Sequence, residues 1–222
     1  IKLAREYTQR QKIVKFEGHF HGFNDYLAFN YWPVREQAWP KITPAVERLP
    51  RYDTEDVIVL PYNDFDKVKE TFDKHGNEIA ALIIEPINYN SGTIMPKEGY
   101  PELLRELTSK NGTILIFDEV LSGFRTGADC AQGYLGVTPD LCTLGKAIGG
   151  GTPLSCFGGK REIMEHISPL GKAQHSGTYN GHLIEIMAGN AFFDIISDKE
   201  FYPKLLKMST GFYDELDALF KR

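Results

Sequence analysis

Short runs of apolar residues alternate with stretches of helical periodicity along most of the chain. Continuous apolar runs of this length are typical of strands that are buried on both faces of a sheet. We expect strands at residues 12–16, 57–60, 79–84, 113–117, 141–144 and 153–157. Their alternation with helices predicts an α/β fold with a mostly parallel sheet and helices on both faces.

Helical periodicity and capping residues place helices between these strands. Asp64 is suited to cap a helix that ends near His75, with Gly76 as its stop. Further helices are predicted at residues 101–110, 161–167 and 183–196. Helical periodicity is already present at Ile1, and an amphipathic helix is still in progress at the last residue, Arg222. From this pattern we expect a fragment of a longer protein.

Composition narrows the class of protein. The 222 residues are 42% hydrophobic and 25% charged, which is typical of a folded globular chain. A net charge of −5 without a long basic run argues against general binding to nucleic acid or to an anionic membrane. No run of apolar residues is long enough to predict a transmembrane helix. Cys130, Cys142 and Cys156 fit neither a disulfide framework nor a zinc ribbon, so we expect a cytoplasmic protein.

The polar residues that follow the strands are the candidates for a site, because ligands of such folds bind at the carboxyl ends of strands. They include Glu85, Asp118 and Lys146. Gly145 and the small residues at 147–151 leave room for a ligand to approach the Lys146 amine. A lysine desolvated there can lose its proton and form a Schiff base, and an acid on a neighbouring strand can pair with a protonated ring nitrogen. A pyridoxal phosphate enzyme needs these two groups.

Two other interpretations of this pair remain open from the residues alone. Asp118 and Lys146 could form a plain salt bridge. Gly145-Lys146 could also belong to a P-loop, but Asp140 stands where the first glycine of that motif should be. Ala147 also replaces the Ser or Thr that a P-loop requires.

His19 and His21 suggest a metal site, because they alternate at the end of the first predicted strand. No third ligand follows at a suitable spacing. We therefore expect both histidines to be structural and no metal to bind.

The residues around Asp118 and Lys146 carry a resemblance to a known family. Residues 117–125, FDEVLSGFR, and residues 139–151, PDLCTLGKAIGGG, resemble the signature of the class III aminotransferases. Residues 15–22, Glu85-Pro86 and Gly177-Thr178 fall in the family's order, so the resemblance runs through nearly the whole chain. It is closest to the glutamate-1-semialdehyde aminomutase branch, where Leu121 replaces a glutamine that many class III enzymes carry. The resemblance implies the large domain of the pyridoxal-phosphate-dependent transferases of fold type I.

The resemblance also implies roles for individual residues. Lys146 would hold pyridoxal 5'-phosphate (PLP) as a Schiff base and then move a proton between the substrate carbon and the cofactor. Asp118 would keep the pyridine nitrogen protonated. Val120 and Phe20 would cover the two faces of the ring, although each could also be a plain core residue. Thr178 would bind the cofactor phosphate across a homodimer interface.

Further contacts are implied at the end of the strand at 79–84 and in the proline-rich segment at 31–51. Asn90, five residues after Glu85, is a candidate for contact with the ring oxygen, and Glu85 is grouped with it in the cofactor site. Trp32 and Trp39 either line an entrance for a larger or apolar amine or pack within their own loop.

The resemblance implies an enzyme that transfers an amino group from an amine or amino acid to a carbonyl acceptor. An aminomutase would use the same residues on one substrate. A catalytically incompetent fragment with a structural role is the alternative from another class. Residues 1–200 would form the cofactor-binding large domain, incomplete at its N-terminus, and residues 201–222 would begin the helix toward a missing C-terminal small domain. We expect a homodimer that binds small molecules, but neither nucleic acid nor membrane.

Overall fold

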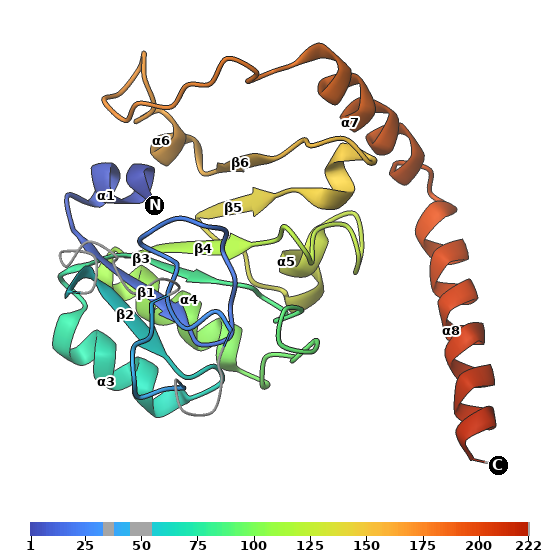
Figure 1. Cartoon of the computed structure of the whole chain (residues 1–222), viewed down its shortest axis with the longest axis horizontal. Helices are drawn as coiled ribbons and strands as arrows, with labels where there is room; N and C mark the ends of the chain where they lie inside the picture. The colour runs from blue at the N-terminus through green and yellow to red at the C-terminus, as the bar shows by residue number, and fades with distance from the viewer. Residues whose placement is uncertain (33–37, 45–54, 222) are drawn as a thin grey trace.

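A six-stranded sheet forms the centre of the molecule (Figure 1). The computed structural model describes residues 1–32, 38–44 and 55–221. The sheet has the order β2-β1-β3-β4-β5-β6 and consists of β1 (Lys12–Phe16), β2 (Val57–Leu60), β3 (Ile79–Ile84), β4 (Ile114–Asp118), β5 (Leu141–Leu144) and β6 (Cys156–Gly159). The first five strands are parallel, and β6 pairs with β5 in the antiparallel direction. The predicted α/β fold with a mostly parallel sheet is confirmed.

Helices occupy the connections that the periodicity assigned to them, and two further helices lie where none was expected. The helices are α1 (Lys2–Thr8), α3 (Phe65–His75), α4 (Tyr100–Asn111), α5 (Cys130–Leu135), α6 (Arg161–Met164), α7 (Leu183–Ile196) and α8 (Phe201–Phe220), together with the 3-10 helix η2 (Lys146–Gly149). The two unexpected helices are α5 and η2. The Asp64 carboxylate accepts a hydrogen bond of 2.9 Å from the backbone N–H of Lys67, which confirms the predicted cap of α3. Within the described residues, none of the helices has both the length and the hydrophobicity to cross a membrane.

Neighbouring residues of each central strand pack on opposite faces of the sheet. Val14 and Leu82 belong to a core under α3 and α4, whereas Ile13 and Ala81 belong to a second core with α1 and α6. Burial of apolar area stabilises both layers, by roughly 25 cal/mol for each Å² removed from water. A strand that is covered on both sides needs apolar residues at every position, which explains the continuous apolar runs.

Two predicted elements end or begin elsewhere. The strand expected at residues 153–157 begins only at Cys156 and continues to Gly159. Pro153 has no N–H to donate to a ladder, and the residues around it line a pocket instead. The helix expected at 161–167 ends at Met164.

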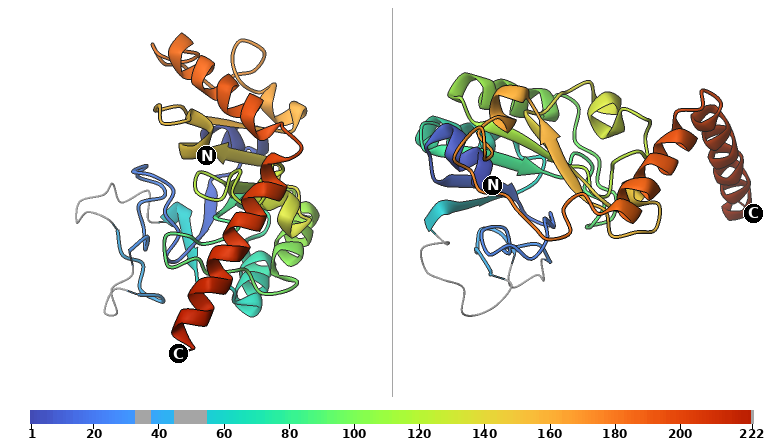
Figure 2. Two further views of the ribbon diagram at one scale, coloured as in Figure 1. Left: turned by 90° about the vertical axis from the view of Figure 1, so that its right-hand side faces the viewer. Right: turned by 90° about the horizontal axis from the view of Figure 1, so that it is seen from above.

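The last two helices lie at one end of the sheet, and α8 extends away from it (Figures 1 and 2). Helix α7 packs closely against η2, because a Cβ on Gly189 would lie 2.8 Å from Leu154 Cδ2 and 3.5 Å from the Ile148 carbonyl oxygen. Helix α8 has no buried residue over its described length. Large apolar side chains are exposed on both helices, among them Leu183 and Phe212.

Candidate functional site

The carboxyl ends of β3, β4 and β5 open into one large pocket of about 1380 Å³. The loop after β1, the start of η2, the segment before α7 and residues of α1 and β6 also contribute to its wall. Six of the seven site residues predicted from the sequence line this pocket, namely Phe20, Glu85, Asn90, Asp118, Val120 and Lys146. Parallel strands bring residues from distant parts of the chain to one edge of the sheet, which is why these six lie together.

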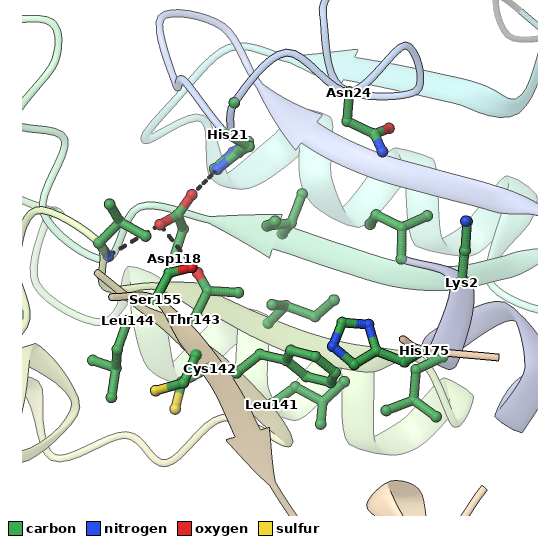
Figure 3. Close-up of a pocket in the computed structure, with 18 of the residues that line it drawn as sticks. Lys2, His21, Asn24, Asp118, Leu141, Cys142, Thr143, Leu144, Ser155 and His175 are labelled. Carbon is green, nitrogen blue, oxygen red and sulfur yellow. Dashed lines mark hydrogen bonds and ion pairs between the residues drawn. The ribbon is translucent and has the colours of Figure 1, made fainter. Parts of the chain in front are cut away.

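Asp118 ends β4, and its carboxylate is held by three partners (Figure 3). His21 Nδ1 lies 2.7 Å from Oδ2, and both Val120 N–H and the Thr143 hydroxyl donate to Oδ1 at 3.1 Å. Burial raises the pKa of Asp118, but the hydrogen bond and charge of His21 and the two donors to Oδ1 outweigh it. The net pKa lies below its usual value, so the group carries a negative charge at neutral pH.

His21 is a site residue that the sequence interpretation missed. The sequence indicated a structural role for His21, and the structure adds that its side chain, 1% exposed, lines the pocket and binds the Asp118 carboxylate. Its Nε2 atom is buried and has no hydrogen-bond partner among the described residues. His19 does support the backbone, since its Nδ1 accepts a 3.0 Å hydrogen bond from Glu85 N–H. The described residues contain no group of three His, Cys, Asp or Glu suited to a metal ion.

Glu85 positions two of the other predicted residues. Its buried Oε1 accepts hydrogen bonds of 2.8 Å from Phe20 N–H and from Asn90 Nδ2. The Phe20 ring lies 5.4 Å from the Phe23 ring and 5.3 Å from the Tyr31 ring, between centroids. Glu85 therefore connects the end of β3 to the loop after β1 and holds an aromatic residue at the edge of the pocket.

Lys146 is the first residue of η2 and is separated from the end of β5 by Gly145 alone. Its φ of 48° lies in the left-handed region, which residues other than glycine rarely adopt and which is found preferentially at functional sites. A Cβ on Gly145 would lie 3.3 Å from Val120 Cγ1, so the glycine allows the backbone just before Lys146 to pass close to the Val120 side chain. The Lys146 side chain is exposed and lines the pocket, so desolvation of its amine would require a ligand that fills the pocket.

The remaining candidates lie outside the pocket wall. Thr178 is exposed and does not line the pocket, although Ser176 and Tyr179 on either side do. Trp32 is 72% exposed, and Trp39 N–H donates a hydrogen bond of 2.6 Å to Glu17. Neither tryptophan lines the pocket. Pro33 and Pro50 of the same proline-rich segment fall outside the described residues.

Comparison with known proteins identifies the family. The family Aminotransferase class-III matches the chain over residues 1–222. The chain belongs to the class III aminotransferases. A curated member, glutamate-1-semialdehyde 2,1-aminomutase 1 of Lachnoclostridium phytofermentans, is 42% identical over 223 residues, which cover 100% of this chain and 52% of that protein. The chain thus spans about half the length of this relative.

Solved structures of transaminases share the fold of this class III chain. An omega-transaminase from Sphaerobacter thermophilus superposes with a TM-score of 0.83 at 36% identity, covering 90% of this chain and 47% of that one. A transaminase with PLP bound gives a TM-score of 0.80 at 30% identity, covering 89% of this chain and 46% of that one. The predicted fold of the PLP-dependent transferases is confirmed.

Proposed function

We propose that this class III chain carries the active site for PLP-dependent transfer of an amino group, with Lys146 and Asp118 as catalytic residues. The observation that carries the proposal is the ionised, buried Asp118 carboxylate at the end of β4, which shares a pocket with the amine of Lys146. The solved transaminase with PLP bound has the same fold. An acid and an amine at neighbouring strand ends are what this cofactor chemistry needs from the protein.

The groups in the pocket fit PLP. The Asp118 carboxylate suits a protonated ring nitrogen, and Val120 and Phe20 offer apolar surface for the two faces of the ring. Asn90, which lines the pocket and donates to Glu85, would contact the ring oxygen. When bound, PLP supplies an aldehyde that takes up the amino group and a ring that delocalises the electrons of the reacting carbon.

The chain's own residues then have separate tasks. Lys146 Nζ would hold the cofactor covalently and, as a free amine, would carry a proton at the reacting carbon. Asp118 would favour a proton on the ring nitrogen, and His21 holds the carboxylate in its orientation. Val120 and Phe20 keep water away from the ring faces.

We place Thr178 in a homodimer, where it binds the phosphate of the partner's cofactor. Its exposure outside its own pocket and the exposed apolar side chains on α7, such as Leu183 and Met187, support this assignment. We also propose that residues 1–200 form the cofactor-binding domain and that α8 leads to a further small domain. The three free cysteines support a cytoplasmic location.

A spectral titration tests the proposed function. The purified protein is mixed with PLP, and we expect a visible absorbance band that borohydride abolishes by fixing the cofactor to the protein. Amines and amino acids are then added one at a time, and a donor is identified by loss of the band. A stable band that no amine removes would contradict amino transfer, and the lack of any band would favour the incompetent fragment.

Glutamate-1-semialdehyde 2,1-aminomutase activity is the second candidate, and the curated relative of that name at 42% identity favours it. An aminomutase moves the amino group within one substrate, so it needs no separate acceptor. Incubation with glutamate-1-semialdehyde alone distinguishes the two. Isomerisation without a second substrate indicates the aminomutase, and turnover only with an added carbonyl acceptor indicates the aminotransferase.

Replacing His21 with alanine is expected to raise the pKa of Asp118, because it removes a hydrogen bond of 2.7 Å and the electrostatic interaction by which His21 lowers that pKa. Since a raised pKa means that the carboxylate protonates earlier as the pH falls, the acid limb of the rate profile should move to higher pH. Hydrogen bonds to charged groups are worth about 1.5–3 kcal/mol, so we expect a loss of about tenfold or more near that limb. His21→Gln, which keeps a donor, serves as the control and should lose less. Identical acid limbs in all three proteins would contradict this role.

A further inference from the structure

Lys15 is a charged residue in the interior of the sheet. It lies on β1, between β2 and β3, and its exposed fraction is 0%. Isolated buried charges are costly, so a lysine at this place needs partners for its ammonium group. The apolar run at residues 12–16 predicts a strand residue here and nothing more.

Three backbone carbonyls surround the Lys15 amino group. Nζ donates to the carbonyl oxygens of His19 at 3.1 Å and Leu27 at 3.0 Å, and also to that of Phe29. His19 lies on the limb of the loop that leaves β1, whereas Leu27 and Phe29 lie on the limb that returns. The Lys15 amino group therefore ties together both limbs of the loop at residues 19–29.

This loop lines part of the pocket, and Phe20 and His21 are the two of its residues that the proposed site uses. Phe20 and His21 follow directly after His19, whose carbonyl Lys15 binds. On the other side, the Glu85 carboxylate accepts the N–H of Phe20. Short contacts on both sides thus fix the backbone from which the Phe20 ring and the His21 imidazole project.

We propose that Lys15 is a positioning residue of the cofactor site, whose three hydrogen bonds hold the loop at residues 19–29 so that Phe20 and His21 face the pocket. The expected effect of Lys15 on cofactor binding rests on the proposed function. The binding of the loop by Lys15 can be measured without cofactor. The role differs from that of Lys146, because Lys15 does not line the pocket.

The charge state of Lys15 sets the conditions of the test. Burial lowers the pKa of Lys15 to about 7, and the charge of the Glu85 carboxylate opposes this shift. The ammonium form has three N–H donors, one for each carbonyl, whereas the neutral amine has only two. Measurements at pH 6 therefore examine the form that satisfies all three carbonyls.

Hydrogen–deuterium exchange on the purified protein at pH 6, with and without PLP, tests the proposal on Lys15→Met. Methionine keeps the length and apolar stem but has no donor. Without cofactor, we expect the amides of residues 18–29 to exchange at least tenfold faster, with no change in residues 141–149. The dissociation constant for PLP should rise about tenfold. Lys12→Met is the matched control on the same strand, where Lys12 binds Glu78 at the surface at 3.4 Å, and it should change neither quantity.

The outcomes separate this proposal from the proposed function. Unchanged exchange in residues 18–29, or faster exchange with unchanged PLP affinity, would overturn the role of Lys15. If the wild-type protein fails to bind PLP, the proposed function fails, while the exchange result still decides whether Lys15 holds the loop. If Lys15→Met does not fold, Lys15→Gln is used with the same expectation, because its shorter amide has only two donors.

Discussion

Replacing Lys146 with alanine is expected to lower the rate of amino transfer by about 10³-fold or more. The change removes the only group of the side chain that can attach the cofactor and the base that moves the proton, and general acid–base catalysis alone contributes about 10²–10⁴-fold. The left-handed φ of 48° at this residue is tolerated by alanine at a similar strain, so the fold should persist. Donor turnover measures the rate, and mass spectrometry after borohydride should find no cofactor bound to the protein.

Two control variants test whether the loss of rate and of attached cofactor is specific to Lys146. Lys69→Ala changes an exposed lysine on α3 and should leave both the rate and the attached cofactor unchanged. Lys2→Ala is the sharper control, because Lys2 also lines the pocket and offers a second amine (Figure 3). Cofactor that stays attached in Lys146→Ala but is lost in Lys2→Ala would show that the wrong lysine has been assigned.

The positions of three candidate site residues could be predicted because they depend on local pattern. Glu85, Asp118 and Lys146 each follow an apolar run, and parallel strands place their carboxyl ends along one edge of the sheet. No knowledge of long-range contacts is needed for that step. The helix cap at Asp64 was predictable for the same reason, since its partner lies only three residues away.

The partners of the buried polar residues could not be predicted, because they are set by the path of a loop. His21 and Asp118 are 97 residues apart in the sequence, and the pattern of apolar and polar residues does not indicate that their side chains are in contact. Lys15 interrupts an apolar run, which indicates burial but not the three carbonyls that satisfy its charge. The exposure of Lys146 could not be predicted either, because small neighbours indicate the room around an amine and not whether water reaches it.

Asp118→Asn is expected to lower the rate of amino transfer by about 10²–10³-fold, the typical cost of removing one preorganised electrostatic group. The amide has the shape of the carboxylate but no negative charge, so it does not favour a proton on the ring nitrogen. Its oxygen can still accept from Val120 N–H and the Thr143 hydroxyl, now 3.1 Å from Oδ1. The fold should therefore change little while the chemistry fails, and rapid mixing with a donor measures the rate at which the visible band disappears.

Thr143→Val shows whether the charge of Asp118 or its hydrogen bonds matter more. Valine removes one neutral donor to Oδ1 and leaves the carboxylate charged and bound to His21. The loss of one such bond is worth about 1 kcal/mol, so we expect less than a tenfold change in rate.

Because the pKa of Asp118 is lowered in the folded chain, the group stays charged as the pH falls until that lowered value is reached. The ratio between wild-type and Asp118→Asn rates should therefore stay constant from pH 6 to pH 8. A ratio near one at these pH values would mean that the charge at the end of β4 does not act on the ring.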